Sequence, residues 1–283
     1  MMIFVGPAGY PSGYRDPLHA LQMVTDLGLN AMEMQFVRQA RMGEEKARSI
    51  GKRARELGIL LSVHAPYYVN FNSNRRETVD KSVEWVVRTC QIADHLGALI
   101  VVIHAASYGT RSVPETTTAV IDGIDRCLGA LSDEGIRVRL GLETMGKKGA
   151  WGRLEEIEEV MEGVEGVVPV LEFGHLHAIC GGCLRTEEDF ARMLEKCGAF
   201  YGGHLHCHFS CIEYSDKGER RHLRLDRKEP DFRALVGPLS SMKRDVTIIS
   251  ETPAPAEDAV IMRKMLNDYG DWQYFKARTT NIY

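Results

Sequence analysis

The stretch Arg139-Leu140-Gly141-Leu142-Glu143 shows the pattern that decides the fold, a short apolar run that closes on a charged side chain. Alternate side chains of a β-strand point to opposite faces, so Leu140 and Leu142 would face covering helices while Glu143 would face the inside of the sheet. Further apolar, β-rich runs recur at spacings that suit strand–helix–strand units with parallel strands. The eight predicted strands span residues 2–6, 31–36, 60–64, 99–104, 139–143, 168–172, 203–208 and 246–251.

Helical patterns fill the intervals between these strands. In the first, residues 17–27, Asp16 is placed to cap the helix, Pro17 suits its first turn and Gly28 follows its end. Further helices are predicted over residues 77–96, 114–131, 187–197, 231–242 and 255–266, and the acidic run 154–161 has the apolar spacing of a solvated helix. The pattern predicts an α/β fold, a (β/α)8 TIM barrel that forms a single domain over residues 1–283, with a C-terminal tail at 270–283 whose role the sequence does not define. A doubly wound open sheet is the rival, but no glycine-rich phosphate loop follows the first strand.

Composition narrows the class of protein. Of the 283 residues, 44% are hydrophobic and 26% are charged, which is enough for a sizeable core. The longest apolar run, 98–103, is only strand-sized and the first residues lack a basic region, so neither a membrane span nor a secretory signal is expected. A net charge of −4 argues against a simple electrostatic nucleic-acid binder, unless the protein carries bound cations. Seven cysteines, an odd number, favour a reducing cytoplasm.

Histidines and glutamates gather at the carboxyl ends of the predicted strands, the face of such a barrel where active sites lie. They could not easily satisfy one another by hydrogen bonds, and divalent cations would supply the missing charge. Mixed histidine and carboxylate ligands suit zinc first, then manganese or iron. Two such ions among three glutamates would leave a positive excess that attracts phosphate. The residues concerned are His64, His104, Glu143, Glu172, His175 and Glu251, together with His204, His206 and His208, which strand alternation turns inward.

Four cysteines offer a second candidate metal site. Cys180 and Cys183 form a CxxC motif, and Cys207 and Cys211 lie at the end of the next strand. Four thiols suit a structural zinc ion or an iron–sulfur cluster. Strand alternation turns Cys207 outward, however, so free thiols are the favoured interpretation.

In combination, these motifs make the chain resemble endonuclease IV, the zinc-dependent apurinic/apyrimidinic endonuclease family within the xylose-isomerase-like barrels. The resemblance runs over nearly the whole chain, strand by strand. Each motif is weak alone, and their combination is specific. The segments that carry it are Val63-His64-Ala65-Pro66-Tyr67-Tyr68-Val69-Asn70, Val102-Ile103-His104, Leu142-Glu143-Thr144, Glu172-Phe173-Gly174-His175-Leu176-His177-Ala178, Leu205-His206-Cys207-His208 and Ile249-Ser250-Glu251-Thr252.

The resemblance implies three zinc sites that share ligands, and two departures from the family's pattern affect them. The family has aspartate in place of Glu172, whose extra methylene still lets a carboxylate reach a metal. It also has an aspartate at the position of Arg220, which cannot ligate, so Glu219 would have to substitute through a one-residue shift of the loop. Two zinc ions are therefore implied, and a third where Glu219 takes over, with manganese or iron as substitutes. Carried over, the first site takes His64, His104 and Glu143, the second Glu143, Glu172, His206 and Glu251, and the third His175 and His222.

The activity that the resemblance implies is hydrolysis of a phosphodiester on the 5′ side of an abasic site in double-stranded DNA, by a metal-bound hydroxide. Glu143 as the bridge and Glu251 as a ligand near the hydroxide would be the catalytic residues. Arg38 and Tyr67 would contact DNA, with Tyr67 entering the duplex at the lesion. Packing of the rim is the alternative role for Tyr67. No membrane and no obligate protein partner are expected.

Two other functions are weighed against this one. A single-metal sugar or sugar-phosphate isomerase or epimerase of the same superfamily would need only Glu143, Glu172, His206 and Glu251. A metal-containing DNA-binding protein without turnover is the third option. Fold alone would not separate the three. The histidines that an isomerase would not need favour the endonuclease, namely His64, His104, His175 and His222.

Overall fold

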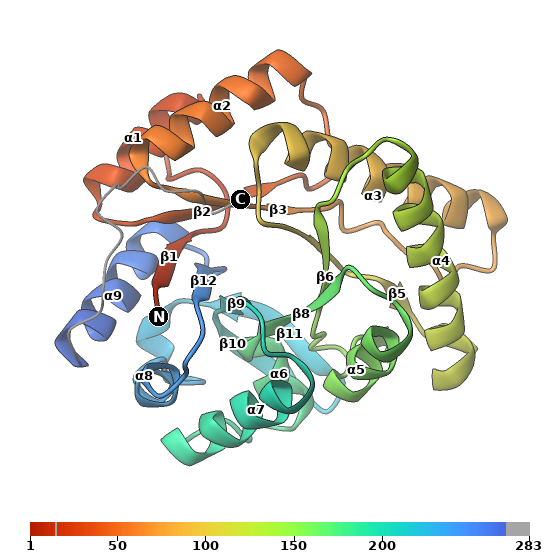
Figure 1. Ribbon diagram of the computed structural model, residues 1–283. Helices are drawn as coiled ribbons and strands as arrows, with labels where there is room; N and C mark the ends of the chain where they lie inside the picture. The colour runs from red at the N-terminus through yellow and green to blue at the C-terminus, as the bar shows by residue number, and fades with distance from the viewer. Residues whose placement is uncertain (15, 270–283) are drawn as a thin grey trace.

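Eight parallel strands curve into a barrel in the computed structural model of the chain, which describes residues 1–14 and 16–269 (Figure 1). Their hydrogen-bonded order is β1-β12-β9-β8-β6-β4-β3-β2. The predicted TIM barrel is therefore confirmed, and every predicted strand lies within two residues of the observed bounds. The strands are β1 (Ile3–Pro7), β2 (Ala31–Gln35), β3 (Leu60–His64), β4 (Ile100–Ile103), β6 (Arg139–Glu143), β8 (Val167–Glu172), β9 (Leu205–Phe209) and β12 (Val246–Ser250).

The seam between β1 and β2 closes the barrel through backbone hydrogen bonds and the side chain of Asn30. Oδ1 of Asn30 accepts a hydrogen bond from the backbone nitrogen of Val5 at 2.8 Å, and its Nδ2 donates to the backbone oxygen of Ile3 at 3.2 Å. At Gly6 any side chain would overlap the backbone oxygen of Ala31, so only glycine permits this close approach. The seam holds β2, and with it Glu33, against the rest of the barrel.

Helices cover the outside of the barrel (Figure 1). Asp16 caps the first of them, and Ser112 and Thr186 begin two others with capping boxes. Among the described residues, no helix is long and apolar enough to cross a bilayer. The helices are α1 (Pro17–Asp26), α2 (Glu44–Leu57), α3 (Arg76–Leu96), α4 (Val113–Asp133), α5 (Leu154–Gly163), α7 (Glu187–Phe200), α8 (Arg233–Ser240) and α9 (Pro255–Tyr269).

Short elements that the sequence analysis did not predict lie beyond the carboxyl ends of the strands. Helix α6 (Phe173–Ile179) follows β8 directly, and β5 (Ala106–Ser107) pairs with β7 (Ala150–Trp151) beyond β4 and β6. A hairpin of β10 (Cys211–Ser215) and β11 (Gly218–Leu223) follows β9. Since parallel strands end at one face, these elements surround the mouth of the barrel.

The cysteines do not form a common metal site. Cys180 and Cys183, just after α6, are joined by a disulfide, whereas Cys207 and Cys211 are free and buried. The expectation of free thiols therefore holds for Cys207 and Cys211 and is wrong for the CxxC pair. The predicted tail, 270–283, lies outside the described residues.

Candidate metal centre

The mouth of the barrel brings together histidines and glutamates from most of its strands. His64 closes β3, Glu143 closes β6 and Glu172 closes β8, while His104 and Glu251 directly follow β4 and β12. Their ligand atoms form groups of three in which all the separations are within 4.8 Å, close enough for each group to hold a metal ion. The groups are His64–His104–Glu143, Glu143–His208–Glu251, Glu172–His175–His222 and Glu33–His206–His208.

The first group joins two imidazoles to one oxygen of Glu143. Nε2 of His104 lies 2.8 Å and Nε2 of His64 lies 3.2 Å from Oε2 of Glu143. Nδ1 of His64 donates its proton to the backbone oxygen of Ala65 at 2.7 Å, so Nε2 of the neutral ring carries a lone pair. A lone pair that faces a buried carboxylate needs a proton or a metal ion between them, and a backbone carbonyl behind the ring is the usual way to orient a metal-binding histidine.

The second group uses the other oxygen of Glu143. Nδ1 of His208 lies 3.5 Å from Oε1 of Glu143 and 3.5 Å from Oε1 of Glu251. Oε1 of Glu143, Nδ1 of His208 and Oε2 of Glu172 are buried, and within the described residues none of them has a hydrogen-bond partner. Buried polar atoms without partners are costly, so several of them in one centre indicate a place for an ion.

The third group sets His175 on α6 against His222 on β11. Their Nε2 atoms are 3.1 Å apart. Nδ1 of His175 donates to the backbone oxygen of Thr144 and Nδ1 of His222 to that of Glu251, each at 2.9 Å. With each Nδ1 proton donated to a carbonyl, the two Nε2 atoms face each other, and only a shared proton or a metal ion makes that arrangement favourable. Glu219 lies beside both, 3.3 Å from Nε2 of His175 and 3.9 Å from that of His222.

A β-bulge explains why Glu219, and not Arg220, reaches this group. The register of the β10–β11 hairpin skips Arg220, which has no partner residue on β10. Glu219 and His222 are three residues apart and would face opposite sides of a regular strand, but the extra residue of the bulge turns both to the same side. Arg220 is exposed and pairs with Glu213 at 3.1 Å. The bulge thus produces the one-residue shift on which the substitution by Glu219 depends.

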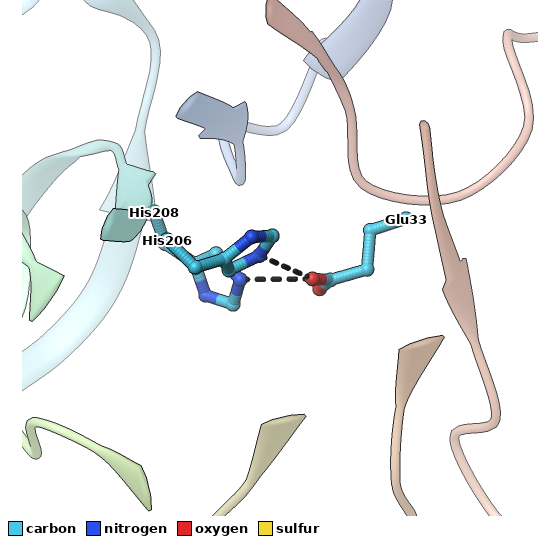
Figure 2. Close-up of side chains that lie close together, drawn as sticks. All are labelled: Glu33, His206 and His208. Atoms are coloured by element: carbon cyan, nitrogen blue, oxygen red, sulfur yellow. Dashed lines mark hydrogen bonds and ion pairs between the residues drawn. The ribbon is translucent and has the colours of Figure 1, made fainter. Parts of the chain in front are cut away.

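The fourth group lies deeper in the barrel, with Glu33 on β2 facing His206 and His208 on β9 (Figure 2). All three side chains are at most 1% exposed. Nε2 of His206 lies 3.0 Å and Nε2 of His208 lies 3.1 Å from the same Oε2 of Glu33. The structure therefore does not place His206 beside Glu143 and Glu251, as the resemblance implied, and places His208 there. Both rings point inward, but His206 lies two residues further from the end of the strand.

The sequence patterns predict no role for Glu33 and indicate only that His208 faces inward. A signal for Glu33 does exist, because it is a charged residue within the otherwise apolar run Ala31-Met32-Glu33-Met34. The other carboxylates were predicted because each of them ends an apolar run. Glu33 lies inside its run, so this criterion does not identify it.

Electrostatics supports a cation at this centre. In the part of the chain that the structure describes, Glu33, Glu143, Glu219 and Glu251 form ion pairs only with histidines. Burial raises the pKa of Glu172 to about 7. Burial alone would also raise the pKa of Glu143, but the histidines around it, His104 first, hold that pKa well below its usual range. The unpartnered ligand atoms and the shortage of fixed positive charge fit divalent metal ions.

The two residues expected to contact DNA lie on the rim of the mouth. Tyr67 is 46% exposed, and its ring centroid lies 5.0 Å from that of His64 and 5.3 Å from that of His104. Its hydroxyl donates to Oε1 of Gln35 at 3.2 Å. Arg38 is exposed and, with neighbours between Gln35 and Arg41, lines a surface pocket of 560 Å³. Both residues are therefore accessible from the side of the metal-binding groups.

Comparisons with known proteins agree with this architecture. The family described as "Xylose isomerase-like TIM barrel" matches residues 21–269. An uncharacterized protein of Methanocaldococcus jannaschii is 31% identical over 274 residues, which cover 95% of this chain and 98% of that protein. A probable endonuclease 4 of Staphylococcus epidermidis is 28% identical over 148 residues, which cover 50% of this chain and 47% of that protein.

Similar solved structures share the fold and differ in the activities that they are named for. Endonuclease IV from Thermus thermophilus has a TM-score of 0.70 at 20% identity, covering 95% of this chain and 98% of that one. A D-tagatose 3-epimerase-like protein has a TM-score of 0.71 at 18% identity, covering 95% and 97%. At these identities the likeness shows the fold and does not choose between the activities. The match over residues 21–269 shows that the chain belongs to the xylose isomerase-like TIM barrel family.

Proposed function

We propose that this protein is a zinc-dependent phosphodiesterase that cleaves double-stranded DNA on the 5′ side of an abasic site. The observation that carries the proposal is the third group, in which Nε2 of His175 and Nε2 of His222 face each other at 3.1 Å beside Glu219. A single-metal enzyme has no use for this group in addition to the first one. Several metal sites around shared glutamates suit a phosphodiester, whose oxygens can contact more than one cation at a time.

The glutamates would hold the metal sites together. Glu143 directs Oε2 to the first group and Oε1 toward His208, so it would bridge two ions. Glu251 places its carboxylate beside His208 and accepts the Nδ1 proton of His222 on its backbone oxygen, so it joins the second and third groups. Divalent ions held there would supply Lewis acidity to a phosphate and lower the pKa of water toward neutrality.

The rim would supply the contacts to the duplex. Arg38 is exposed and would bind a backbone phosphate. Tyr67 presents an exposed ring above His64 and His104, where it would stack at the gap left by the missing base. These contacts position DNA over the centre despite the overall charge of −4, since bound cations offset the glutamates.

A single-metal sugar or sugar-phosphate isomerase or epimerase is the second candidate. The group Glu143–His208–Glu251 would suffice for one ion, and the fold is as similar to a D-tagatose 3-epimerase-like protein as to an endonuclease IV. The number of bound metal ions separates the candidates. Elemental analysis of protein purified without added metal should give at least two transition-metal ions per chain for the endonuclease, and one for the isomerase.

The direct test is a duplex that carries one tetrahydrofuran analogue of an abasic site. This analogue resists β-elimination, so a nick on its 5′ side reports hydrolysis. We expect wild-type protein to nick it and Glu251→Gln to lose the activity while it stays folded, because the variant loses a charged ligand beside His208. Glu257→Gln, which changes an exposed glutamate at the start of α9, is the matched control and should nick normally. Full activity in Glu251→Gln would remove Glu251 from the reaction.

A further inference from the structure

Glu33 is a buried carboxylate that already has a donor for each of its oxygens. Its Oε2 accepts hydrogen bonds from Oγ of Ser62 at 2.9 Å, from Nε2 of His206 at 3.0 Å and from Nε2 of His208 at 3.1 Å. Its Oε1 accepts from Nε2 of Gln35 at 2.9 Å. Glu143, by contrast, keeps Oε1 without a hydrogen-bond donor among the described residues. Glu33 therefore differs from the glutamates that have an oxygen left for an ion.

The rings held by Glu33 carry their protons on the opposite nitrogen from the other oriented histidines. Within the described residues, Nδ1 of His206 and Nδ1 of His208 have no hydrogen-bond partner. Their acceptor is Glu33, so the proton of each neutral ring lies on Nε2. His208 consequently turns the lone pair of Nδ1 toward Oε1 of Glu143 and Oε1 of Glu251, 3.5 Å from each.

From this arrangement we infer that Glu33 is a positioning residue that fixes the ring and the tautomer of His208, so that His208 binds metal through Nδ1. The inference rests on the metal centre of the proposed function, and it does not depend on the substrate. A carboxylate behind a metal-binding imidazole orients the ring and makes it a stronger ligand. His206 is the second ring that Glu33 holds, and it is not a ligand of the ion.

A chain of hydrogen bonds connects Glu33 to the rim of the barrel. The hydroxyl of Tyr67 donates to Oε1 of Gln35 at 3.2 Å, and Nε2 of Gln35 donates to Glu33 at 2.9 Å. Ser62, on the neighbouring strand, holds the other oxygen of Glu33. Bonds from two sides thus keep the carboxylate of Glu33 in one orientation, which a positioning role requires.

The wild-type protein provides the first test, without any substitution. Long-range ¹H–¹⁵N spectra of histidine-labelled protein distinguish protonated, unprotonated and metal-bound ring nitrogens. With zinc bound, we expect His208 to show a protonated Nε2 and a metal-bound Nδ1, and His206 to show a protonated Nε2 and no metal. Zinc on Nε2 of either ring would overturn the inference and would make Glu33, His206 and His208 a metal site.

Two variants of Glu33 separate positioning from packing. Glu33→Leu removes every acceptor, so the tautomer of His208 should become mixed and zinc affinity should fall by about 10- to 100-fold. Glu33→Gln keeps an oxygen for the imidazole protons, so it should keep the tautomer of His208 and lose less affinity. Equal, wild-type affinity in both variants would overturn the inference. If Glu33→Leu does not fold, the tautomer of His208 in Glu33→Gln and in wild type decides whether the inference holds.

The matched control is Glu156→Gln, which changes another buried carboxylate that belongs to none of the four groups. Glu156 accepts from the hydroxyl of Tyr108 and from the backbone nitrogens of Gly152 and Arg153. This variant should leave zinc affinity unchanged. Because every readout is metal binding or a ring tautomer, a failure to nick DNA would count against the proposed function and leave the inference on Glu33 standing.

Discussion

Two groups in this barrel have the same composition and carry their protons differently. Each consists of one glutamate and two histidines whose Nε2 atoms point to a single carboxylate oxygen. In the group at the mouth, Nδ1 of His64 gives its proton to the carbonyl of Ala65, so Nε2 is left as a ligand. In the inner group, no carbonyl accepts from Nδ1 of His206 or His208 among the described residues, so Nε2 is the donor. The groups are His64–His104–Glu143 and Glu33–His206–His208.

The carboxylates of the two groups also differ, because within the described residues only one of them has its second oxygen free of hydrogen bonds. Oε1 of Glu33 is held by Gln35, while Oε1 of Glu143 has no hydrogen-bond donor in the described part of the chain. A cluster of metal-binding residue types is therefore not by itself a metal site. What lies behind each ring and beside each second oxygen decides whether the cluster binds an ion or orients a neighbour that does.

The largest expected effect comes from removing one ring from each group. His104→Ala takes a ligand from the first site, and nicking should fall by roughly 10³-fold, in line with the several kcal/mol that a metal ion contributes to such a reaction. His206→Ala removes only a ring that Glu33 holds, and nicking should fall by no more than ~10-fold. Both variants are compared by initial rates and by metal content. Similar losses of metal in the two variants would erase the distinction between the groups.

The pH dependence of stability tests whether Glu172, unlike Glu33, lacks partners that favour its charged form. Glu33 and Glu172 are both fully buried, yet the histidines hold the pKa of Glu33 below its usual value, whereas burial raises that of Glu172 from 4.5 to about 7. A raised carboxyl pKa contributes stability below pH 4.5 that is lost as pH rises through about 7. Relative to Glu172→Gln, metal-free wild type should therefore lose about 3 kcal/mol of unfolding free energy over that range.

Denaturant unfolding in the presence of a chelator, at several values of pH, measures this difference. Oε1 of Glu172 accepts from Oγ of Ser210 at 2.8 Å, and a glutamine keeps that acceptor, so the variant isolates the charge. Parallel stability curves for the two proteins would show that the carboxylate of Glu172 is not the group that burial penalises. With zinc bound, the carboxylate gains a partner and the pH dependence should shrink.

The sequence predicts the mouth of the barrel well and its interior poorly. His64, Glu143 and Glu172 each end an apolar run, and parallel strands end at one face, so their meeting follows from the pattern alone. Glu33 lies inside a strand. Strand alternation predicts that its side chain points inward, but nothing in the sequence predicts which residues it contacts. His206 and His208 share one phase of alternation, and which of them reaches Glu143 depends on the stagger of β9 in the barrel.

Local irregularities of the backbone are the second feature of the site that could not be predicted from the sequence. The bulge that brings Glu219 to His222 depends on the pairing of a hairpin that has no periodic apolar pattern, Gly218-Glu219-Arg220-Arg221-His222. The resemblance to endonuclease IV indicated only that a shift was needed. The tautomers of the rings likewise depend on which backbone carbonyl lies behind each histidine, and that is known only from the folded chain.

Glu219 and Arg220 form a matched pair for the third group. Glu219→Gln removes the charge beside His175 and His222, and the most weakly held metal ion should lose affinity by roughly tenfold or more. Arg220→Gln changes an exposed neighbour that pairs with Glu213, and metal affinity should not change. Zinc titration against a competing chelator measures both. A larger loss in Arg220→Gln would mean that the bulge does not place Glu219 as described.

The smallest expected effect concerns Tyr67, which contacts the group at the mouth and is linked to the inner group only through Gln35. Its ring lies over His64 and His104, and its hydroxyl bonds to Gln35, which holds Glu33. Tyr67→Ala should lower the preference for an abasic over an intact duplex by about tenfold, the scale of one base–aromatic stacking contact. Tyr67→Phe keeps the ring and loses the bond to Gln35, so it should keep that preference. Loss of metal from Tyr67→Ala in proportion to its loss of binding would indicate instead that the ring packs the rim and supports His64 and His104.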